Sequence, residues 1–282
     1  MKKIISLIVT ALLAVTCVFS LTACDPAEEG NVIKIGAQSG TTGYTFSTYL
    51  KGTEAKPYQS PVLAVTDMKN GAIDYVVTDK AVAENLVKKV EGISMLDIAL
   101  TGEEHFGMAV DVNQAQLLAD VNAFFVAKAN EINDIQAKYL AGEESSYVGI
   151  EANVTVAGAT ETLKVATNAE YAPFEFKQGE LFYGIDMEIA KLLAEYLGMN
   201  LQIVDMPFPS VVSSVGSDSF DIAIAALTIT SARDQNINFT DAYYTNSQVI
   251  LYNNSNKAFF DDEGELAVFN VMDVLAVLCA NK

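Results

Sequence analysis

Apolar runs that stop abruptly in polar residues are the main pattern along this chain. The clearest begins at Asp221, continues in Ile and Ala without alternation, and then passes through Thr228 to Arg233. Unbroken apolar runs are typical of strands covered on both faces of a parallel α/β sheet, where ligands collect at the carboxyl ends. We therefore expect Thr228 and Thr230 to offer hydroxyls and Arg233 to hold a carboxylate. A helix cap at Thr230 or Ser231 beside a surface arginine would explain the same pattern.

A similar unit opens the first half of the chain. Val32 to Ala37 alternates like a strand and leads through Gln38-Ser-Gly-Thr-Thr-Gly43 into a predicted helix. Backbone N–H groups at a helix start bind anions readily, and Thr41 and Thr42 add hydroxyl donors. A capped turn without a ligand is the alternative.

A second apolar strand, Ile73 to Asp79, ends in an acid and precedes a predicted helix from Lys80 to Lys89. Asp79 can pair with a ligand ammonium, cap this helix, or do both. One long helical stretch is expected from Asn113 to Tyr139.

The stretch from Ala141 to Thr162 lacks a helical period and reads as a linker with one edge strand. A second αβ unit follows, with predicted strands at Leu163 to Thr167 and Leu201 to Val204. Between these strands, Gly184 to Leu197 forms an amphipathic helix that Gly198 should close. Two similar α/β halves are therefore predicted.

The N-terminus reads as an export signal, because Lys2 and Lys3 precede an apolar stretch from Ile4 to Ser20. The next residues, Leu21 to Cys24, resemble the lipobox of bacterial lipoproteins, which implies a lipidated Cys24 after cleavage. An uncleaved transmembrane anchor is the alternative. Residues 25–31 look like a short tether.

The composition of the chain argues against several classes of partner and of functional site. Without residues 1–23, which hold two lysines and no acids, 15 basic residues face 36 acidic ones, a formal charge of −21. Nucleic acid and anionic lipid are therefore poor partners. Of three cysteines only Cys279 remains as a free thiol, and the single histidine, His105, lies between acids in an expected solvated loop. A disulfide framework, a metal site or a histidine-based triad is not expected.

The motifs in the second half resemble the family 3 extracellular solute-binding proteins, the polar amino-acid receptors of bacterial ABC importers. The resemblance rests on Val165 to Phe176, Gly184 to Lys191, Thr228 to Arg233 and Phe239 to Tyr244. In the first half it rests on Gly36 to Gly43, Lys69 to Asp74 and Val77 to Asp79. It implies a two-lobed periplasmic-binding-protein fold of type II, with no cofactor and no catalytic pair.

The resemblance also implies a ligand site. Arg233 and Thr228 would hold the α-carboxylate of an amino acid, helped by Thr41 and Thr42, and Asp79 would take the α-ammonium. The remaining expected contacts are Tyr171 and Phe208 around the ligand, Asn168 and Gln38 near its side chain, and Ala226 where glycine is common in the family.

The order of the halves departs from the family, whose first lobe comes first. Here the expected order is a second-lobe-like domain with tail helices (32–140), a linker (141–162) and a first-lobe-like domain (163–252), followed by an extension without a clear match (253–282). This indicates a circular permutation. We expect the break in one of the two hinge crossovers, leaving one intact; a fusion of halves from two receptor genes is the alternative.

The sequence thus predicts a lipid-anchored, extracytoplasmic receptor that captures a polar amino acid and delivers it to an ABC permease. A dehydratase on the same fold is the enzymatic alternative, with Glu170 and Glu175 as its nearby acids. A signalling lobe and a rearranged product that binds nothing are further alternatives.

Overall fold

The computed structural model describes residues 32–50, 52–97, 99–215, 219–234 and 237–255. The described residues from Lys34 onward belong to one compact unit. None of the helices in these ranges has the length and apolar character needed to cross a membrane. The predictions for the signal, the tether, Cys24, Cys279 and nearly all of the C-terminal extension concern residues outside the described part.

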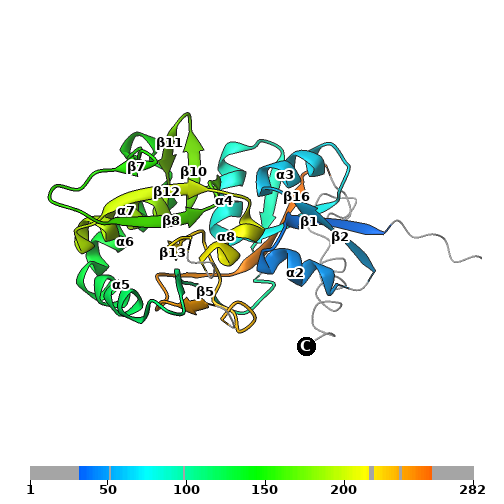
Figure 1. Cartoon of the computed structure of the whole chain (residues 1–282). Coiled ribbons are helices and arrows are strands. Elements are labelled where there is room, and N and C mark those ends of the chain that lie inside the picture. Colours follow the sequence, from blue (N-terminus) through cyan, green and yellow to red (C-terminus); the bar gives the residue numbers. More distant parts are fainter. Residues whose placement is uncertain (1–31, 51, 98, 216–218, 235–236, 256–282) are drawn as a thin grey trace, which may run out of the picture. The chain divides into compact units, whose positions relative to one another are not determined.

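The first half of the chain supplies most of a five-stranded sheet in the order β2-β1-β3-β16-β4 (Figure 1). β3 lies parallel to β1, whereas β16 runs antiparallel to both β3 and β4. Its strands are β1 (Ile33–Gln38), β2 (Thr53–Tyr58), β3 (Tyr75–Asp79), β4 (Ile93–Leu96) and β16 (Gln248–Asn253), with helices α2 (Thr42–Thr48), α3 (Pro61–Lys69) and α4 (Lys80–Lys89).

The second half supplies most of a six-stranded sheet in the order β14-β6-β13-β8-β12-β7. Its strands are β6 (Ala109–Asp111), β7 (Asn153–Val154), β8 (Thr162–Thr167), β12 (Asn200–Asp205), β13 (Ile222–Ala223) and β14 (Ile237–Phe239). The helices here are α5 (Ala115–Ala127), α6 (Ala129–Ala141), α7 (Ile185–Leu197) and α8 (Phe208–Val215), and a small sheet comprises β9 (Glu170–Tyr171), β10 (Glu175–Gln178) and β11 (Leu181–Tyr183). The predicted α/β class is confirmed.

Each sheet contains one strand that comes from the other half of the chain. β6, encoded early, lies between β13 and β14, and β16, encoded late, lies between β3 and β4. The chain crosses between the sheets through β5 (Glu104–Phe106) and again through β15 (Tyr244–Asn246), and these two strands pair with each other. The prediction of a single intact crossover is therefore wrong, and the sheets do not divide at the expected boundaries of 140 and 163.

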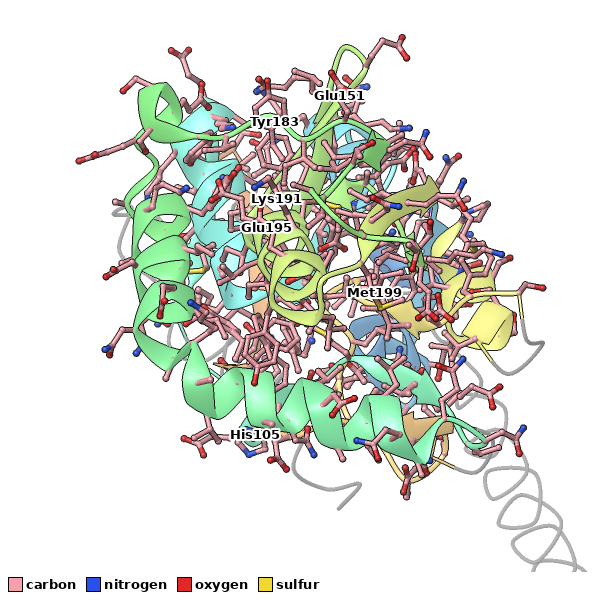
Figure 2. The ribbon with its side chains drawn as sticks, turned by 60° about the vertical axis from the view of Figure 1, so that its left-hand side comes forward. His105, Glu151, Tyr183, Lys191, Glu195 and Met199 are labelled. Atoms are coloured by element: carbon pink, nitrogen blue, oxygen red, sulfur yellow. The ribbon has the colours of Figure 1, made fainter. Side chains whose placement is uncertain are left out.

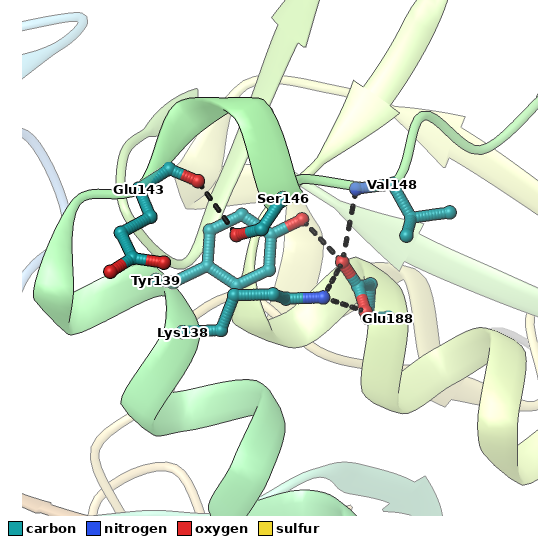
Figure 3. A network of polar contacts seen from close by, with 6 residues as sticks. All are labelled: Lys138, Tyr139, Glu143, Ser146, Val148 and Glu188. Atoms are coloured by element: carbon teal, nitrogen blue, oxygen red, sulfur yellow. Dashed lines mark hydrogen bonds and ion pairs between the residues drawn. The ribbon is translucent and has the colours of Figure 1, made fainter.

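The expected long helix after Asn113 is two helices, because the α-helical course is interrupted at Lys128. The second of them, α6, is fastened to α7 by a partly buried cluster of polar contacts (Figure 3). Lys138 donates to both carboxylate oxygens of Glu188 at 2.6 Å, and the Tyr139 hydroxyl donates to Glu188 at 2.7 Å. These contacts place α6 on the six-stranded side, and the expected edge strand of the linker is β7, which pairs with β12.

α7 shows how the sequence pattern becomes packing. Its buried face carries Ile185, Ile189 and Leu193, and Gly198 ends it in the left-handed conformation, as predicted. The opposite face is polar, with an ion pair between Lys191 and Glu195 (Figure 2). The amphipathic helix thus covers the six-stranded sheet with its apolar stripe.

His105, which is exposed, stands on β5 instead of in a loop. The described residues contain no cluster of histidine, cysteine and acidic side chains that could hold a metal ion.

Candidate functional site

A small cavity collects side chains from both halves of the chain. It is lined by Thr41, Thr42, Asp79, Tyr171, Phe208, Ala225, Ala226, Thr228 and Arg233. Eight of the ten residues predicted from the sequence are in this set, and Ala225 is the one addition. Its water-accessible volume is about 10 Å³, roughly the room of one water molecule. The two halves must move apart before anything as large as an amino acid can enter.

Asp79 is the acidic group of the cavity. It ends the fully buried strand β3 and precedes α4, but its side chain makes no capping hydrogen bond to that helix. Its carboxylate instead accepts hydrogen bonds from the Tyr171 hydroxyl, from the Asn246 amide, and from the Gln248 amide at 2.6 Å. The helix-cap interpretation of Asp79 is therefore wrong, and the carboxylate is held by neutral donors.

Burial raises the pKa of Asp79 to about 7 from its usual value near 3.8. The negative charge of Glu104 raises this pKa further, whereas the hydrogen bonds from Tyr171, Gln248 and Asn246 lower it. A buried carboxyl with this pKa changes its charge near neutral pH, and an ammonium group placed against it would favour the ionised form.

Arg233 is the basic group of the cavity. It follows the apolar run on a turn, and no helix begins at Thr230 or Ser231. Its guanidinium donates to the Thr228 carbonyl at 2.8 Å and, from the other half of the chain, to the Gly40 carbonyl at 3.0 Å. It also lies over the Phe208 ring, 5.6 Å from the ring centre. Burial lowers the pKa of Arg233, which is nevertheless a group that stays charged in proteins.

The two threonines on either side of the cavity share one acceptor, Glu104 of β5. Its Oε2 accepts from the Thr42 hydroxyl at 2.9 Å, from the Thr228 hydroxyl at 3.1 Å and from the Gln248 amide at 3.1 Å. The Thr41 hydroxyl is also occupied, because it caps α2 by accepting from the Tyr44 N–H and donates to the Gln38 carbonyl. These hydroxyls are therefore engaged within the protein.

Ala226 occupies the cavity wall in a conformation that side chains rarely adopt, with φ at +46°. Its N–H donates to the buried carboxylate of Asp186 at 2.7 Å, which also accepts from the Tyr243 hydroxyl at 2.9 Å. Burial raises the pKa of Asp186 to about 7, and burial together with the charge of Asp186 raises the pKa of Glu175 well above its usual value. The buried Asp186 carboxyl thus supports the left-handed turn from behind, through its hydrogen bond with the Ala226 N–H.

Gln38 and Asn168 were predicted to lie near a ligand side chain, but neither lines the cavity. The Gln38 amide donates to the Asn168 side-chain carbonyl at 2.7 Å, joining the two halves of the chain. Of the alternative acids, Glu175 is fully buried against Asp186 and Glu170 accepts from Gln59 at 3.0 Å, so neither lines the cavity.

Sequence reasoning missed Glu104, Asn246 and Gln248, all on or next to the paired crossovers β5 and β15. Their local pattern gives no indication of a site, because their position depends on strand pairing between residues about 140 apart. The one available signal was the polar interruption Asn246-Ser-Gln248 directly before the apolar residues of β16.

The family model of the bacterial extracellular solute-binding proteins, family 3, matches residues 163–276. This match continues past residue 252, so residues 253–276, which were expected to lack a clear match, fall within it. The arginine-binding extracellular protein ArtP of Bacillus subtilis is 36% identical over 89 residues, 32% of this chain and 35% of that protein. The histidine-binding periplasmic protein of Escherichia coli K12 is 33% identical over 107 residues, 37% and 41% of the two chains.

Cyclohexadienyl dehydratase of Pseudomonas aeruginosa is also similar, 31% identical over 38% of this chain and 43% of that enzyme. Among solved structures, an ancestral cationic amino-acid solute-binding protein is 35% identical, with a TM-score of 0.26, over 26% of this chain and 33% of that chain. The chain thus spans 35% to 43% of the length of the curated relatives named here. Over residues 163–276 the chain is similar to the bacterial extracellular solute-binding proteins of family 3.

Proposed function

We propose that this chain binds a polar amino acid between its two sheets and serves as the substrate-binding component of an ABC importer. The observation that carries the proposal is the meeting of Arg233 and Asp79, encoded in opposite halves, on the wall of one cavity. A guanidinium and a carboxylate that line the same cavity match the two charges of an α-amino acid. The arginine-binding and histidine-binding names of two relatives support this ligand class.

To bind a ligand, Asp79 and Arg233 must each exchange a hydrogen-bond partner within the protein for a group of the ligand. Asp79 would release the Tyr171 hydroxyl for the ligand ammonium, and Arg233 would release the Gly40 carbonyl for the ligand carboxylate. Both of these contacts cross between the halves, so breaking them removes two of the hydrogen bonds that hold the cavity closed. Closing the halves on a ligand then restores a fully paired site, a form of domain closure around the ligand.

Isothermal calorimetry of the purified protein against the common amino acids tests the proposal. We expect at least one of them to bind, and Arg233→Ala and Asp79→Asn each to weaken it by more than about 100-fold, because each leaves a buried ligand charge unpaired. Lys191→Met and Glu195→Gln, on the outer face of α7, are the matched controls and should bind normally. A folded protein that gives no heat with any amino acid would overturn the proposal.

The same titration addresses the origin of the two halves. Loss of affinity in both Arg233→Ala and Asp79→Asn would mean that both halves serve one ligand. Retained affinity in Asp79→Asn would instead favour a fusion of two unrelated receptor halves.

We further infer a circular permutation. Ile35 and Tyr252 both pair with Tyr75 from opposite sides of β3, so they lie two strand spacings, about 10 Å, apart. Because β16 is antiparallel to β3 and β1 is parallel to it, the last residues of β16 and the first residues of β1 lie at the same end of the strands. A linker of about four residues spans this gap. A chain that begins near residue 150, carries this linker and ends near residue 142 should fold and bind unchanged; failure to fold would count against permutation.

The lipid anchor and importer belong to the same proposal and rest on the sequence around Cys24. Cys24→Ala is expected to release the protein from the membrane fraction of the expressing cells. Continued membrane association of that variant would overturn the lipid anchor while leaving ligand binding untouched.

A further inference from the structure

Glu104 is a carboxylate held in place without a counter-charge. Three neutral groups, the Thr42 and Thr228 hydroxyls and the Gln248 amide, donate to its Oε2. Within the described residues no lysine, arginine or histidine lies within ion-pair distance of it, and no hydrogen bond to its other oxygen, Oε1, is found. The three donors fix the direction of this carboxylate but leave its charge unbalanced.

With a zwitterionic amino acid bound, the charged groups of the site and the ligand would not sum to zero. Arg233 contributes one positive charge, and Asp79 and Glu104 contribute two acidic groups. A zwitterionic amino acid would pair its carboxylate with Arg233 and its ammonium with Asp79, leaving Glu104 unmatched. Because a partly desolvated, unpaired charge is costly, a ligand with one further positive charge fits the site better.

There is room for such a group beside the small cavity. A second, larger pocket of about 430 Å³ shares Thr41, Thr42 and Arg233 with it and has Glu104 on its wall. The rest of its lining is mainly apolar and includes Phe46, Tyr49 and Ala232. An apolar wall with one carboxylate suits an aliphatic stem that ends in a cation.

Two further acceptors of the same hydrogen-bond network are unpaired, although they lie outside the lining of both pockets. The side-chain carbonyls of Asn246 and Gln248 are buried and have no hydrogen-bond partner, although the amide nitrogens of both side chains donate to Asp79. Buried polar atoms rarely stay unpaired. Ammonium and guanidinium groups carry donors only, so they match the two acidic groups, Asp79 and Glu104, that line the cavity and the larger pocket.

We propose that Glu104 selects cationic amino acids, by pairing with the charged end of the ligand side chain in the larger pocket. This inference rests on the proposed amino-acid binding and narrows its ligand class. It also revises the role of Thr42 and Thr228. Their hydroxyls orient Glu104, and the ligand carboxylate is left to Arg233.

The test compares arginine with citrulline, which has the same length but a neutral end group, by calorimetry. Wild-type protein is expected to bind arginine at least about tenfold more tightly. In Glu104→Gln this ratio should fall below about threefold through weaker arginine binding, with citrulline little changed. Glu104→Asp keeps the charge and should retain most of the preference. Glu103→Gln removes the charge of an exposed neighbour that lines a different pocket and is the matched control.

The outcomes separate this inference from the proposed function. Equal binding of arginine and citrulline by wild-type protein, or an unchanged ratio in Glu104→Gln, would overturn the role of Glu104 and leave amino-acid binding in place. No binding of any amino acid would overturn the proposed function itself. Thermal melts followed by circular dichroism check that each variant is folded, and equal binding of arginine and citrulline by wild-type protein would overturn the role of Glu104 even if Glu104→Gln does not fold.

Discussion

The two sheets share one strand order but deliver their site residues in different ways. Without the edge strand β7, the six-stranded sheet reads β12-β8-β13-β6-β14, which has the same arrangement as β2-β1-β3-β16-β4. In the five-stranded sheet, Asp79 stands at the end of a regular, fully buried strand. In the six-stranded sheet, the matching strand β13 is only two residues long, and the chain reaches Arg233 through the left-handed Ala226.

This difference shows two solutions to the same positioning problem. The Asp79 carboxylate is held by hydrogen bonds from side chains, which include the amide groups of Asn246 and Gln248 from the second half of the chain. The irregular segment before Arg233 is held from behind through its backbone by Asp186, at the start of α7. A change in side-chain charge should therefore act mainly on the Asp79 side, and a change in backbone freedom mainly on the Arg233 side.

The largest effect is expected at Gly184, immediately before α7. Its φ is +122°, and an added Cβ would lie 2.0 Å from the Phe174 carbonyl oxygen. Because this atom belongs to the backbone, Gly184→Ala should lower the free energy of unfolding by about 3–5 kcal/mol. Gly179, with φ of +62° and open space around it, is the matched control; Gly179→Ala should cost about 1 kcal/mol. Equal losses in urea unfolding would contradict the role given to this close approach.

An intermediate effect on the free energy of unfolding is expected when the pH is raised. The folded protein raises the pKa values of Asp79 and Asp186 to about 7 from 3.8, so it binds protons more tightly than the unfolded chain does. Their contribution to stability is therefore complete below about pH 4 and is lost as the pH rises to 7 and above. For Asp79 this loss is about 2–4 kcal/mol at most.

The Asp79 share is measured as the difference between wild type and Asp79→Asn in urea unfolding from pH 4 to pH 8. The loss of wild-type stability between pH 4 and pH 8 should be smaller with bound amino acid, because the ligand ammonium favours the ionised carboxylate. The share of Asp186 should not respond to ligand, since this residue does not line the cavity. Parallel pH profiles for wild type and Asp79→Asn without ligand would refute this assignment.

The smallest effect is expected at Ala226. Glycine adopts a φ of +46° without the steric cost that alanine bears there, although glycine also gains entropy in the unfolded chain. Ala226→Gly should therefore raise the unfolding free energy by about 0.5 kcal/mol. Ala225→Gly, next to it and without a positive φ, should lower it by about 1 kcal/mol. Thermal melts of the two variants should shift in opposite directions, and shifts in the same direction would argue against strain at Ala226.

Much of the local structure could be predicted from the sequence. The strand ending at Asp79, the helix from Lys80 to Lys89 and the helix closed by Gly198 follow from local periodicity and end signals. The pairing of β6 and β16 with the opposite sheets could not be predicted this way, because a run of apolar residues does not specify which strand it will join.

The candidate site also contains residues that the sequence indicated and residues that it did not. Arg233, Thr228, Asp79 and the aromatic residues stand at ends of predicted elements, so their types and positions pointed to a ligand. The left-handed Ala226 gave no local signal beyond the absence of a glycine expected from the resemblance. Glu104 belongs to a short strand whose neighbours along the chain are acidic and polar, so only its long-range contacts reveal it.

The paired crossovers have a mechanical consequence. β5 and β15 form a two-stranded ribbon in which Phe106, His105 and Glu104 stand opposite Tyr244, Thr245 and Asn246. Sliding one strand along the other would break these backbone hydrogen bonds, whereas bending the ribbon would keep them. The two sheets should therefore separate by rotation about one axis, with little translation. Glu104 and Asn246 are paired in this ribbon, so the charge of a ligand would be sensed in the part of the molecule that such a rotation displaces least.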